Sequence, residues 1–402
     1  MKIEKTYFIM ASAIIGIFIP TSVGGEISSY YSLLAFLVPA FLLLLSVKLS
    51  IWNQKRILYA AALFCIILIF TALSPFLYIA WGGGAPYILA VIVLLTDFRS
   101  SMFSVNRKID QLLMFTVFFI SMLILTAGLG IIFESKFWVE FIGGNYQSLS
   151  DDLFEHMIVW NQKPVTVFGS HSTAAFVYFA LFAINLKIAR SINLNKFLKI
   201  LYLGLVIGFA VLNWFLSSNT SIAMSAFMLL FFIAEPFKSI FKFAVPIAIG
   251  IAFFILMLII YNFIAFQNFL SDVDGNGITA RYASGGRLQG TYDYLFNNYF
   301  VPIGISYSPA LELGDNFIAE YIIKTSIFGY LIILYLLWSW LRIYLSLYQS
   351  VAFFAFFLIA DFAYPLLVYS RVAAALPFFV LVWGRLNFGI SSNYICTNKF
   401  RR

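Results

Sequence analysis

Two arginines stand close together in one polar stretch of an otherwise apolar chain. Arg281 and Arg287 lie in the segment TARYASGGRLQGTYDY, beside Gly285 and Gly286, which let the backbone bend. An arginine stays charged at physiological pH, and its planar fork of N–H donors matches the oxygens of a phosphate group. The pattern therefore favours binding of a lipid-linked phosphate or diphosphate. The alternative is a loop that only touches anionic lipid headgroups.

Three polar residues next to apolar runs could orient or deprotonate an attacking hydroxyl group. His171 lies in VFGSHSTAAFVYF at the start of one run, and Asp315 and Asn316 shortly precede another. Histidine and aspartate both serve as general acids or bases. Helix capping is the structural alternative for His171 and Asp315, because polar residues are common where helices begin. The residue types leave both interpretations open.

Two further residues have both a functional and a structural explanation. Tyr292 could stack on the face of a sugar, although tyrosines are also common where helices meet the membrane surface. Asp361 lies inside an apolar run, in LIADFAYP. A structural hydrogen bond is the favoured interpretation of Asp361, and an ion pair, a protonated carboxyl group or ion coupling are the alternatives.

Metal and nucleotide chemistry have no visible basis in the sequence. The chain has 2 histidines and 2 cysteines, which do not form a cluster with the spacing of metal ligands. A glycine-rich loop that ends in Lys-Ser or Lys-Thr is also absent from the sequence. We therefore expect no metal and no cofactor, and no ATP-driven step.

The amino-acid composition indicates which secondary structure elements must position these residues. Of 402 residues, 62% are hydrophobic and only 10% are charged. Soluble domains are roughly half apolar and about a quarter charged, so a soluble enzyme, a nucleic-acid-binding domain and a disordered chain are excluded. The net charge of +8 is explained by basic residues at the cytoplasmic ends of membrane helices. The sequence predicts an all-α polytopic integral membrane protein.

About twelve apolar runs are long enough to approach the thickness of a bilayer. They cover 7–23, 31–47, 57–74, 77–95, 111–133, 169–187, 197–216, 219–234, 241–264, 321–342, 350–368 and 371–388. Glycines at 82–84 and Pro86 interrupt the fourth run, so the third and fourth runs could instead form one re-entrant element.

The basic residues predict the orientation of the chain. If the N-terminus is cytoplasmic, 19 of the 25 lysines and arginines fall in cytoplasmic segments and alternate loop after loop. Both termini are then cytoplasmic, and the external basic residues are Lys136, Lys163, Arg281, Arg287, Lys324 and Arg371. We expect a single transmembrane domain over 1–402.

Two loops on the external side are enlarged, at 134–168 and at 265–320. Loops of this length in a compact protein are usually functional or disordered. The first loop is acidic and rich in aromatic residues, which disordered linkers lack, so we expect it to fold onto the membrane surface. The second carries Arg281, Arg287, Tyr292, Asp315 and Asn316.

This topology, with four short stretches, resembles the O-antigen and capsular polysaccharide polymerases of the Wzy type, which share an architecture with the O-antigen ligases. The stretches are GSHSTAAF, FLSSNTSIAMSAFMLL, SGGRLQGTYDYLFNNYFVPIGIS and DNFIAEYIIKTSIFGYL. Asn219 stands where the family more often has an arginine. Asp315 stands where ligases have a histidine, and Ser326 replaces the first glycine of the motif that ends at Gly329. Loss of that histidine argues for a polymerase.

The resemblance implies a GT-C-like helical bundle and a metal-independent inverting glycosyltransferase of the bacterial inner membrane. Such an enzyme transfers a growing glycan from undecaprenyl diphosphate onto an incoming lipid-linked repeat unit at the periplasmic face. Arg287 and Arg281 would hold the diphosphate, and Asp315 or His171 would act on the acceptor hydroxyl. A chain-length regulator and a flippase are the partners that the resemblance implies, together with membrane lipid.

Two alternatives remain. A lipid-linked oligosaccharide flippase or another secondary transporter would use a residue such as Asp361 and the break at 82–86, but transporters of this size often carry an internal repeat, which is absent here. An O-antigen ligase is the closer alternative because it has the same architecture.

Overall fold

The computed structural model describes residues 5–47, 54–74, 78–79, 84–103, 107–146, 156–190, 194–234, 301–307, 318–363 and 365–391. The described chain is mostly helical. Five of its helices are long and apolar enough to cross a membrane. The total of twelve spans stays a prediction, and the run at 241–264 lies outside the described residues.

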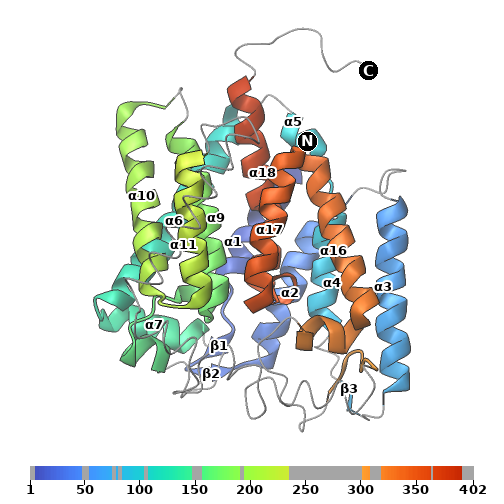
Figure 1. Ribbon diagram of the computed structural model, residues 1–402. Helices are drawn as coiled ribbons and strands as arrows, with labels where there is room; N and C mark the ends of the chain where they lie inside the picture. Colours follow the sequence, from blue (N-terminus) through green and yellow to red (C-terminus); the bar gives the residue numbers. More distant parts are fainter. Residues whose placement is uncertain are drawn as a thin grey trace.

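The helices stand side by side in one bundle (Figure 1). The first half comprises α1 (Lys5–Phe18), β1 (Ser22–Val23), β2 (Glu26–Ile27), α2 (Ser29–Leu44), α3 (Gln54–Leu73), β3 (Tyr78–Ile79), α4 (Ala85–Leu95), α5 (Arg99–Phe103), α6 (Arg107–Ile132), α7 (Lys136–Tyr146), η3 (His156–Trp160) and η4 (Thr166–Phe168). The second half comprises α9 (His171–Ala189), α10 (Lys196–Phe215), α11 (Asn219–Ala234), β4 (Ser306–Tyr307), η7 (Ile318–Ile323), α16 (Lys324–Tyr344), α17 (Leu347–Ala363), η8 (Leu366–Val368) and α18 (Ser370–Ser391).

Two helices form the centre of the bundle. Every residue of α9 after His171 is buried, and α18 is buried from Val372 to Val382. A helix that is apolar on all sides can only be accommodated where other helices cover all of its faces. Helix α9 contacts α6, α10, α11 and α17, whereas α18 contacts α1, α2 and α4. The two central helices also contact each other, so they join the two halves of the bundle.

The two ends of the bundle differ in charge. Helix α1 begins and α18 finishes at the same end (Figure 1), which we call the basic end because most described lysines and arginines lie there: Lys5, Lys55, Arg56, Arg99, Arg107, Lys108, Lys187, Arg190, Lys196, Lys199, Arg342 and Arg385. The opposite end carries both strand pairs, and we call it the hairpin end. Its described basic residues are Lys136, Lys163, Lys324 and Arg371. The asymmetry matches the pattern that predicts a cytoplasmic basic end.

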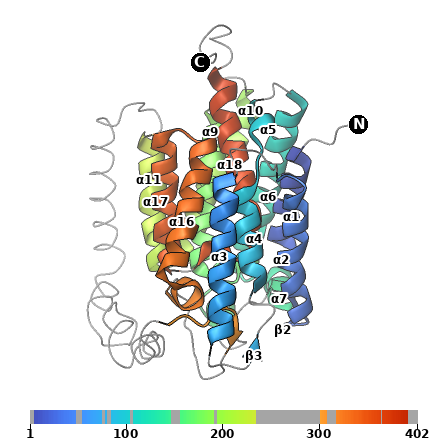
Figure 2. The ribbon, with the colours of Figure 1, turned by 90° about the vertical axis from the view of Figure 1, so that its right-hand side faces the viewer.

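The segment predicted as the fourth span is not one helix. Helix α4 begins only at Ala85, with Pro86 in its first turn, where the missing N–H of proline has no helical partner to lose. Before it, the strand pair Tyr78–Ile79 bonds in antiparallel register to Ser306–Tyr307. Helices α3 and α4 are separate elements that lie side by side with α16 (Figure 2), and the re-entrant alternative stays open.

The described parts of the loop at 134–168 are folded against the hairpin end. Helix α7 packs on α6 and on β1. The backbone N–H of Thr21 donates to the carbonyl of Asn145 over 2.9 Å, and that of Gly25 donates to Gly144 over 3.2 Å. Burial lowers the pKa of Lys163 in the same loop. The contact of this loop with a membrane surface stays a prediction, and most of the second loop, 265–320, lies outside the described residues.

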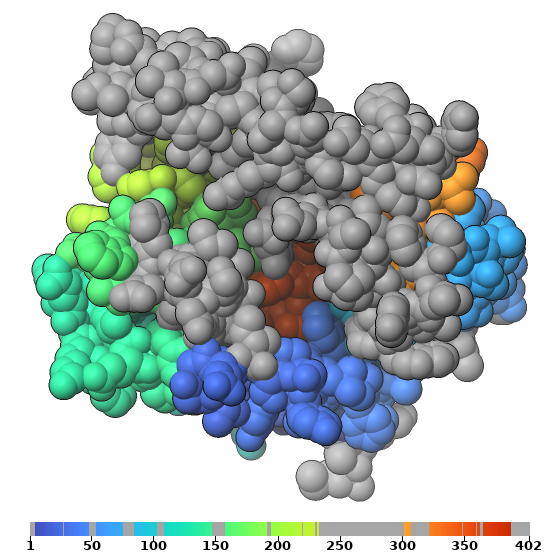
Figure 3. Space-filling model, turned by 90° about the horizontal axis from the view of Figure 1, so that it is seen from below, coloured from blue at the N-terminus to red at the C-terminus, as the bar shows by residue number. Residues whose placement is uncertain are grey.

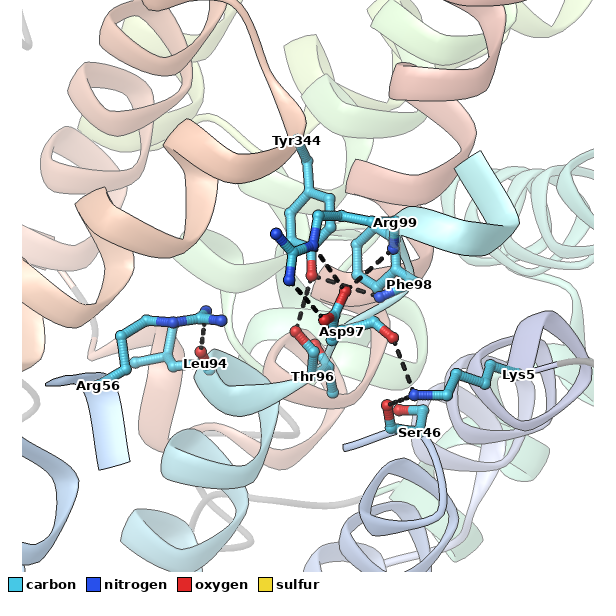
Figure 4. A network of polar contacts seen from close by, with 9 residues as sticks. All are labelled: Lys5, Ser46, Arg56, Leu94, Thr96, Asp97, Phe98, Arg99 and Tyr344. Atoms are coloured by element: carbon cyan, nitrogen blue, oxygen red, sulfur yellow. Dashed lines mark hydrogen bonds and ion pairs between the residues drawn. The ribbon is translucent and has the colours of Figure 1, made fainter. Parts of the chain in front are cut away.

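At the basic end, the connection after α4 is held by aromatic groups from α16 (Figure 4). The Tyr344 hydroxyl donates to the Thr96 carbonyl over 2.8 Å and accepts from the backbone N–H of Phe98 over 3.3 Å. The rings of Phe98 and Tyr344 stack with centroids 3.9 Å apart, and Trp340 Nε1 donates to Thr96 Oγ1. These contacts satisfy backbone groups where α4 ends, which would otherwise lack partners.

Cations complete this network. Lys5 Nζ donates to the carbonyls of Ser46 and Asp97, over 2.7 and 3.2 Å, and so joins α1, α2 and the α4 end. Arg56 donates to the Leu94 carbonyl over 2.9 Å. Burial raises the pKa of Asp97, but the hydrogen bonds and the charge of Arg99, 2.9 Å away, together with the charge of Lys5, keep the pKa below its usual value.

Helix α16 contains a break at its hairpin end. Ser326 has φ 67° and ψ 170°, a conformation that L-residues other than glycine rarely adopt. The residues before the break form the π-helical turn η7, and the N–H of Ile303 donates to the Ile323 carbonyl over 2.8 Å. The sequence motif has a serine in place of a glycine at this position, so Ser326 carries the strain that a glycine would avoid.

The contact between α1 and α18 depends on a small residue. A Cβ atom placed on Gly16 would lie 2.3 Å from the Cβ of Ala374, so any larger side chain forces the two helices apart. Gly16→Val should lower the free energy of unfolding by about 1–3 kcal/mol through overpacking. Thermal unfolding of the purified protein in detergent measures this loss. Gly204→Val is the matched control, because no atom lies within 4 Å of a Cβ there. Equal stability of the two variants would contradict the packing.

Candidate functional site

One of the six predicted site residues is placed by the structure. His171 is the first residue of α9, at the hairpin end. Arg281, Arg287, Tyr292, Asp315 and Asn316 lie outside the described residues. The part of the site that the structure describes is therefore built around the start of α9 and the elements that meet it.

The chain turns sharply before His171. Gly169 has φ 63°, the left-handed conformation that lets η4 give way to α9, and Ser170 then takes the N-cap position. The Ser170 side chain makes no capping hydrogen bond, while Thr173 Oγ1 donates to the Ser170 carbonyl over 3.0 Å. His171 is half-buried. It lies at the rim of the bundle, at the place where a catalytic or a cap-region histidine was expected.

The serine-rich turn before α11 has a structural role. Ser218 and Ser221 cap each other, because the backbone N–H of each donates to the hydroxyl of the other, over 2.9 and 3.1 Å. Asn213 Nδ2 donates to the Ser221 carbonyl over 2.7 Å. A hydrogen bond of 3.1 Å between Ser172 and Thr220 ties this turn to α9. The hydroxyls of Ser218 and Ser221 therefore serve helix capping.

Among the described cations at the hairpin end, Arg371 is the most deeply buried, with 1% of its surface exposed. It is the second residue of α18, and its Nη1 donates to the Tyr369 hydroxyl over 3.0 Å. Nη2 donates to the Ile19 carbonyl over 3.2 Å and to Thr21 Oγ1 over 3.0 Å. The guanidinium also lies over the ring of Tyr146, 5.3 Å from its centroid. One side chain thus joins α18, the end of α1 and α7.

The partners of Arg371 are themselves tied to the elements around His171. The Tyr369 hydroxyl donates to the carbonyl of Phe168, the last residue of η4. The Tyr146 hydroxyl donates to the Phe18 carbonyl over 2.8 Å. Burial raises the pKa of Tyr146, and the charge of Arg371 opposes that shift. Arg371 and the start of α9 therefore belong to one connected cluster, which we call the Arg371 cluster: Ile19, Thr21, Tyr146, Phe168, Tyr369 and Arg371.

A second buried polar group lies where α17 passes into η8. Asp361 Oδ1 accepts from the Tyr321 hydroxyl over 3.0 Å and from the backbone N–H of Leu366 over 2.7 Å. The N–H of Leu367 donates to the Tyr321 hydroxyl over 3.3 Å. These contacts are the structural hydrogen bonds that the sequence favoured for Asp361. Pro365 ends the helical run predicted at 350–368, so the chain turns inside that run.

Seen from the hairpin end, red atoms from the C-terminal part of the chain lie next to blue atoms of the N-terminal part (Figure 3). The connection between α17 and α18 is itself buried, since Leu366, Leu367 and Val368 are at most 8% exposed. Connections usually run over the surface. Here the connection instead belongs to the interior of the bundle.

Sequence reasoning placed Arg371 among the external basic and polar residues and gave it no role of its own. Its type and place held a stronger signal, because a charged residue next to a long apolar run is costly unless it has a function or partners. Among the described residues, no group of histidine, cysteine or carboxylate side chains is arranged to hold a metal ion.

The fold and this cluster define a class: a mostly helical chain that has, among its described residues, five helices that could cross a membrane and buried polar groups at both ends of the bundle. The chain matches no protein-family model, no curated protein and no solved structure.

The role of Asp361 can be separated into geometry and charge. Asp361→Ala removes the acceptor for two buried donors and should lower the free energy of unfolding by about 2–4 kcal/mol. Asp361→Asn keeps an acceptor oxygen and should lose less than half of that. Unfolding of the purified variants in detergent measures both. If Asn is as damaging as Ala, the charge of Asp361 matters more than its hydrogen bonds.

Proposed function

We propose that this protein polymerises lipid-linked oligosaccharide repeat units into O-antigen or a related surface polysaccharide at the periplasmic face of the bacterial inner membrane. The observation that carries the proposal is a group of polar residues at the end of the bundle that has few of the described lysines and arginines. The Arg371 cluster, His171 and Asp361 all lie toward the hairpin end, whereas the lysines and arginines concentrate at the other end. The resemblance to Wzy-type polymerases supports the same assignment.

The chemistry suits the residue types. The acceptor hydroxyl of the incoming repeat forms a bond to the anomeric carbon of the growing glycan, and the bond from that carbon to undecaprenyl diphosphate breaks with inversion. Asp315 or His171 takes the proton of the hydroxyl. Arg287 and Arg281 neutralise the charge that develops on the departing diphosphate. Asn316 and Tyr292 contact the substrate, Tyr292 by stacking on a sugar face.

The polymer reaction needs no ATP, because cleavage of the bond to the diphosphate drives each transfer. In this proposal the enzyme works beside a flippase that delivers repeat units and a regulator that limits chain length. The transporter alternative relied in part on Asp361, whose two hydrogen bonds now give it a structural reason. The ligase alternative shares the architecture and is separated by experiment.

The surface glycolipid of a strain without this gene tests the proposal. We expect lipid A–core that carries a single repeat unit and no ladder, because units still cross the membrane and are still attached. Gel electrophoresis beside the parent strain shows the difference. Core without any repeat would instead point to a flippase or a ligase and would overturn the polymerase assignment.

The role of Arg287 is tested in the same strain. Arg287→Ala should abolish the ladder while the protein still reaches the membrane, because the diphosphate loses its main cationic ligand. Arg342→Ala is the control, since Arg342 is an exposed arginine at the basic end, and it should restore the ladder. A normal ladder from Arg287→Ala would exclude Arg287 from diphosphate binding.

A further inference from the structure

Arg371 is a buried cation whose partners are all neutral. Its hydrogen bonds go to the Tyr369 hydroxyl, the Ile19 carbonyl and Thr21 Oγ1, and its ring contact is with Tyr146. Within the described part of the chain, Arg371 makes no ion pair. Burying a charge is costly unless an opposite charge compensates it. Among the described residues, no negatively charged group compensates the charge of Arg371.

Arg385, the other buried arginine of α18, has a carboxylate that compensates its charge. Arg385 is 7% exposed and lies at the basic end of the same helix. Its Nε donates to Asp110 Oδ1 over 2.7 Å, and its Nη1 donates to the Ser101 carbonyl. One helix thus carries two buried guanidinium groups, of which Arg385 has a carboxylate and Arg371 does not. The difference is in the partners rather than in the helix.

Arg371 also has N–H donors that make no hydrogen bond to the described part of the chain. A guanidinium has five N–H groups, and the three hydrogen bonds of Arg371 use only Nη1 and Nη2. Its Nε is buried and has no acceptor. An unpaired buried donor is expensive. A group that brings both negative charge and acceptor oxygens would satisfy both requirements at once.

We propose that the Arg371 cluster binds a phosphate oxygen of the diphosphate that links the substrate to its lipid. This assignment rests on the proposed function and adds a third arginine to Arg281 and Arg287. A diphosphate supplies several acceptor oxygens and the negative charge that Arg371 lacks as a partner among the described residues. Charge-assisted hydrogen bonds to arginine are stronger than hydrogen bonds between neutral groups. Arg371 lies at the hairpin end, where the buried start of α18 meets α1, α7 and η4.

Entry of the diphosphate requires that the cover of the guanidinium moves. Thr21 and Ile19 belong to the short connection between α1 and β1, which is joined to α7 by the 2.9 Å bond from Thr21 to Asn145. The Thr21 hydroxyl can rotate away and release one donor of Nη2 to the ligand. Arg371 then contacts substrate and positions the donor, while proton transfer stays with Asp315 or His171.

Thermal unfolding of the purified full chain in detergent tests the site without any need for activity. The probes are farnesyl diphosphate, farnesol and inorganic pyrophosphate. For the wild type, we expect farnesyl diphosphate to raise the melting temperature in a saturable way and farnesol to leave it unchanged. Arg371→Gln should weaken the apparent affinity by about tenfold or more, the loss expected for a charge-assisted hydrogen bond.

Arg385→Gln is the matched control, because it removes a buried arginine from the same helix. It should lower the melting temperature of the free protein and keep the response to farnesyl diphosphate. Should Arg371→Gln not fold, Arg371→Lys keeps the charge without the planar fork, and we expect a weakened response from it. An unchanged response from the folded Arg371 variant would overturn the site, and so would the absence of any response in the wild type.

The probes also distinguish the source of the diphosphate. A response to inorganic pyrophosphate that equals the response to farnesyl diphosphate would show a site for free diphosphate and would overturn the lipid-linked assignment. The fate of the proposed function is read separately, from the glycolipid of the gene-deletion strain. If that strain loses the ladder and Arg371→Gln fully restores it, the function stands and the Arg371 site fails. If the ladder persists without the gene while the Arg371-dependent response remains, the site stands and the function fails.

Discussion

The structure depends on one constraint: a polar group inside this apolar bundle must find its partner within the protein. Backbone groups are satisfied by the helices themselves, and the difficult places are the helix ends. The connection after α4 shows the solution at the basic end, where the Tyr344 hydroxyl and the Lys5 ammonium group bond to its backbone. The connection between α17 and α18 shows it at the hairpin end, where Asp361 accepts from Leu366.

The same constraint separates the two ends by function. At the basic end, Asp97 pairs with Arg99 and Asp110 pairs with Arg385, so the buried charges there serve the fold. At the hairpin end, Arg371 joins three elements through neutral groups and keeps a buried Nε without an acceptor. The difference between the ends is that Arg99 and Arg385 each pair with a carboxylate, whereas Arg371 has no carboxylate partner among the described residues.

Sequence patterns predicted the helices well and their ends poorly. Long apolar runs locate α3, α6, α9 and α10 because burial of a whole helix requires continuous hydrophobicity. The predicted start of the fourth helix was wrong. The residues before α4 instead form a strand pair in which Tyr78 lies opposite Tyr307, a residue far away in the sequence. The strained backbone at Ser326 was also not predicted, because a serine in the sequence does not indicate a positive φ.

The candidate site was predictable only in part, for a related reason. His171 could be placed from its position at the start of an apolar run, because that position is local. The importance of Arg371 lies in what surrounds it, namely a carbonyl from the end of α1 and hydroxyls from Thr21 and Tyr369. A count of charged residues in the sequence does not distinguish Arg371 from Arg385, since both are arginines of one helix. Only the three-dimensional arrangement shows that Arg385 has a carboxylate partner and that Arg371 has none among the described residues.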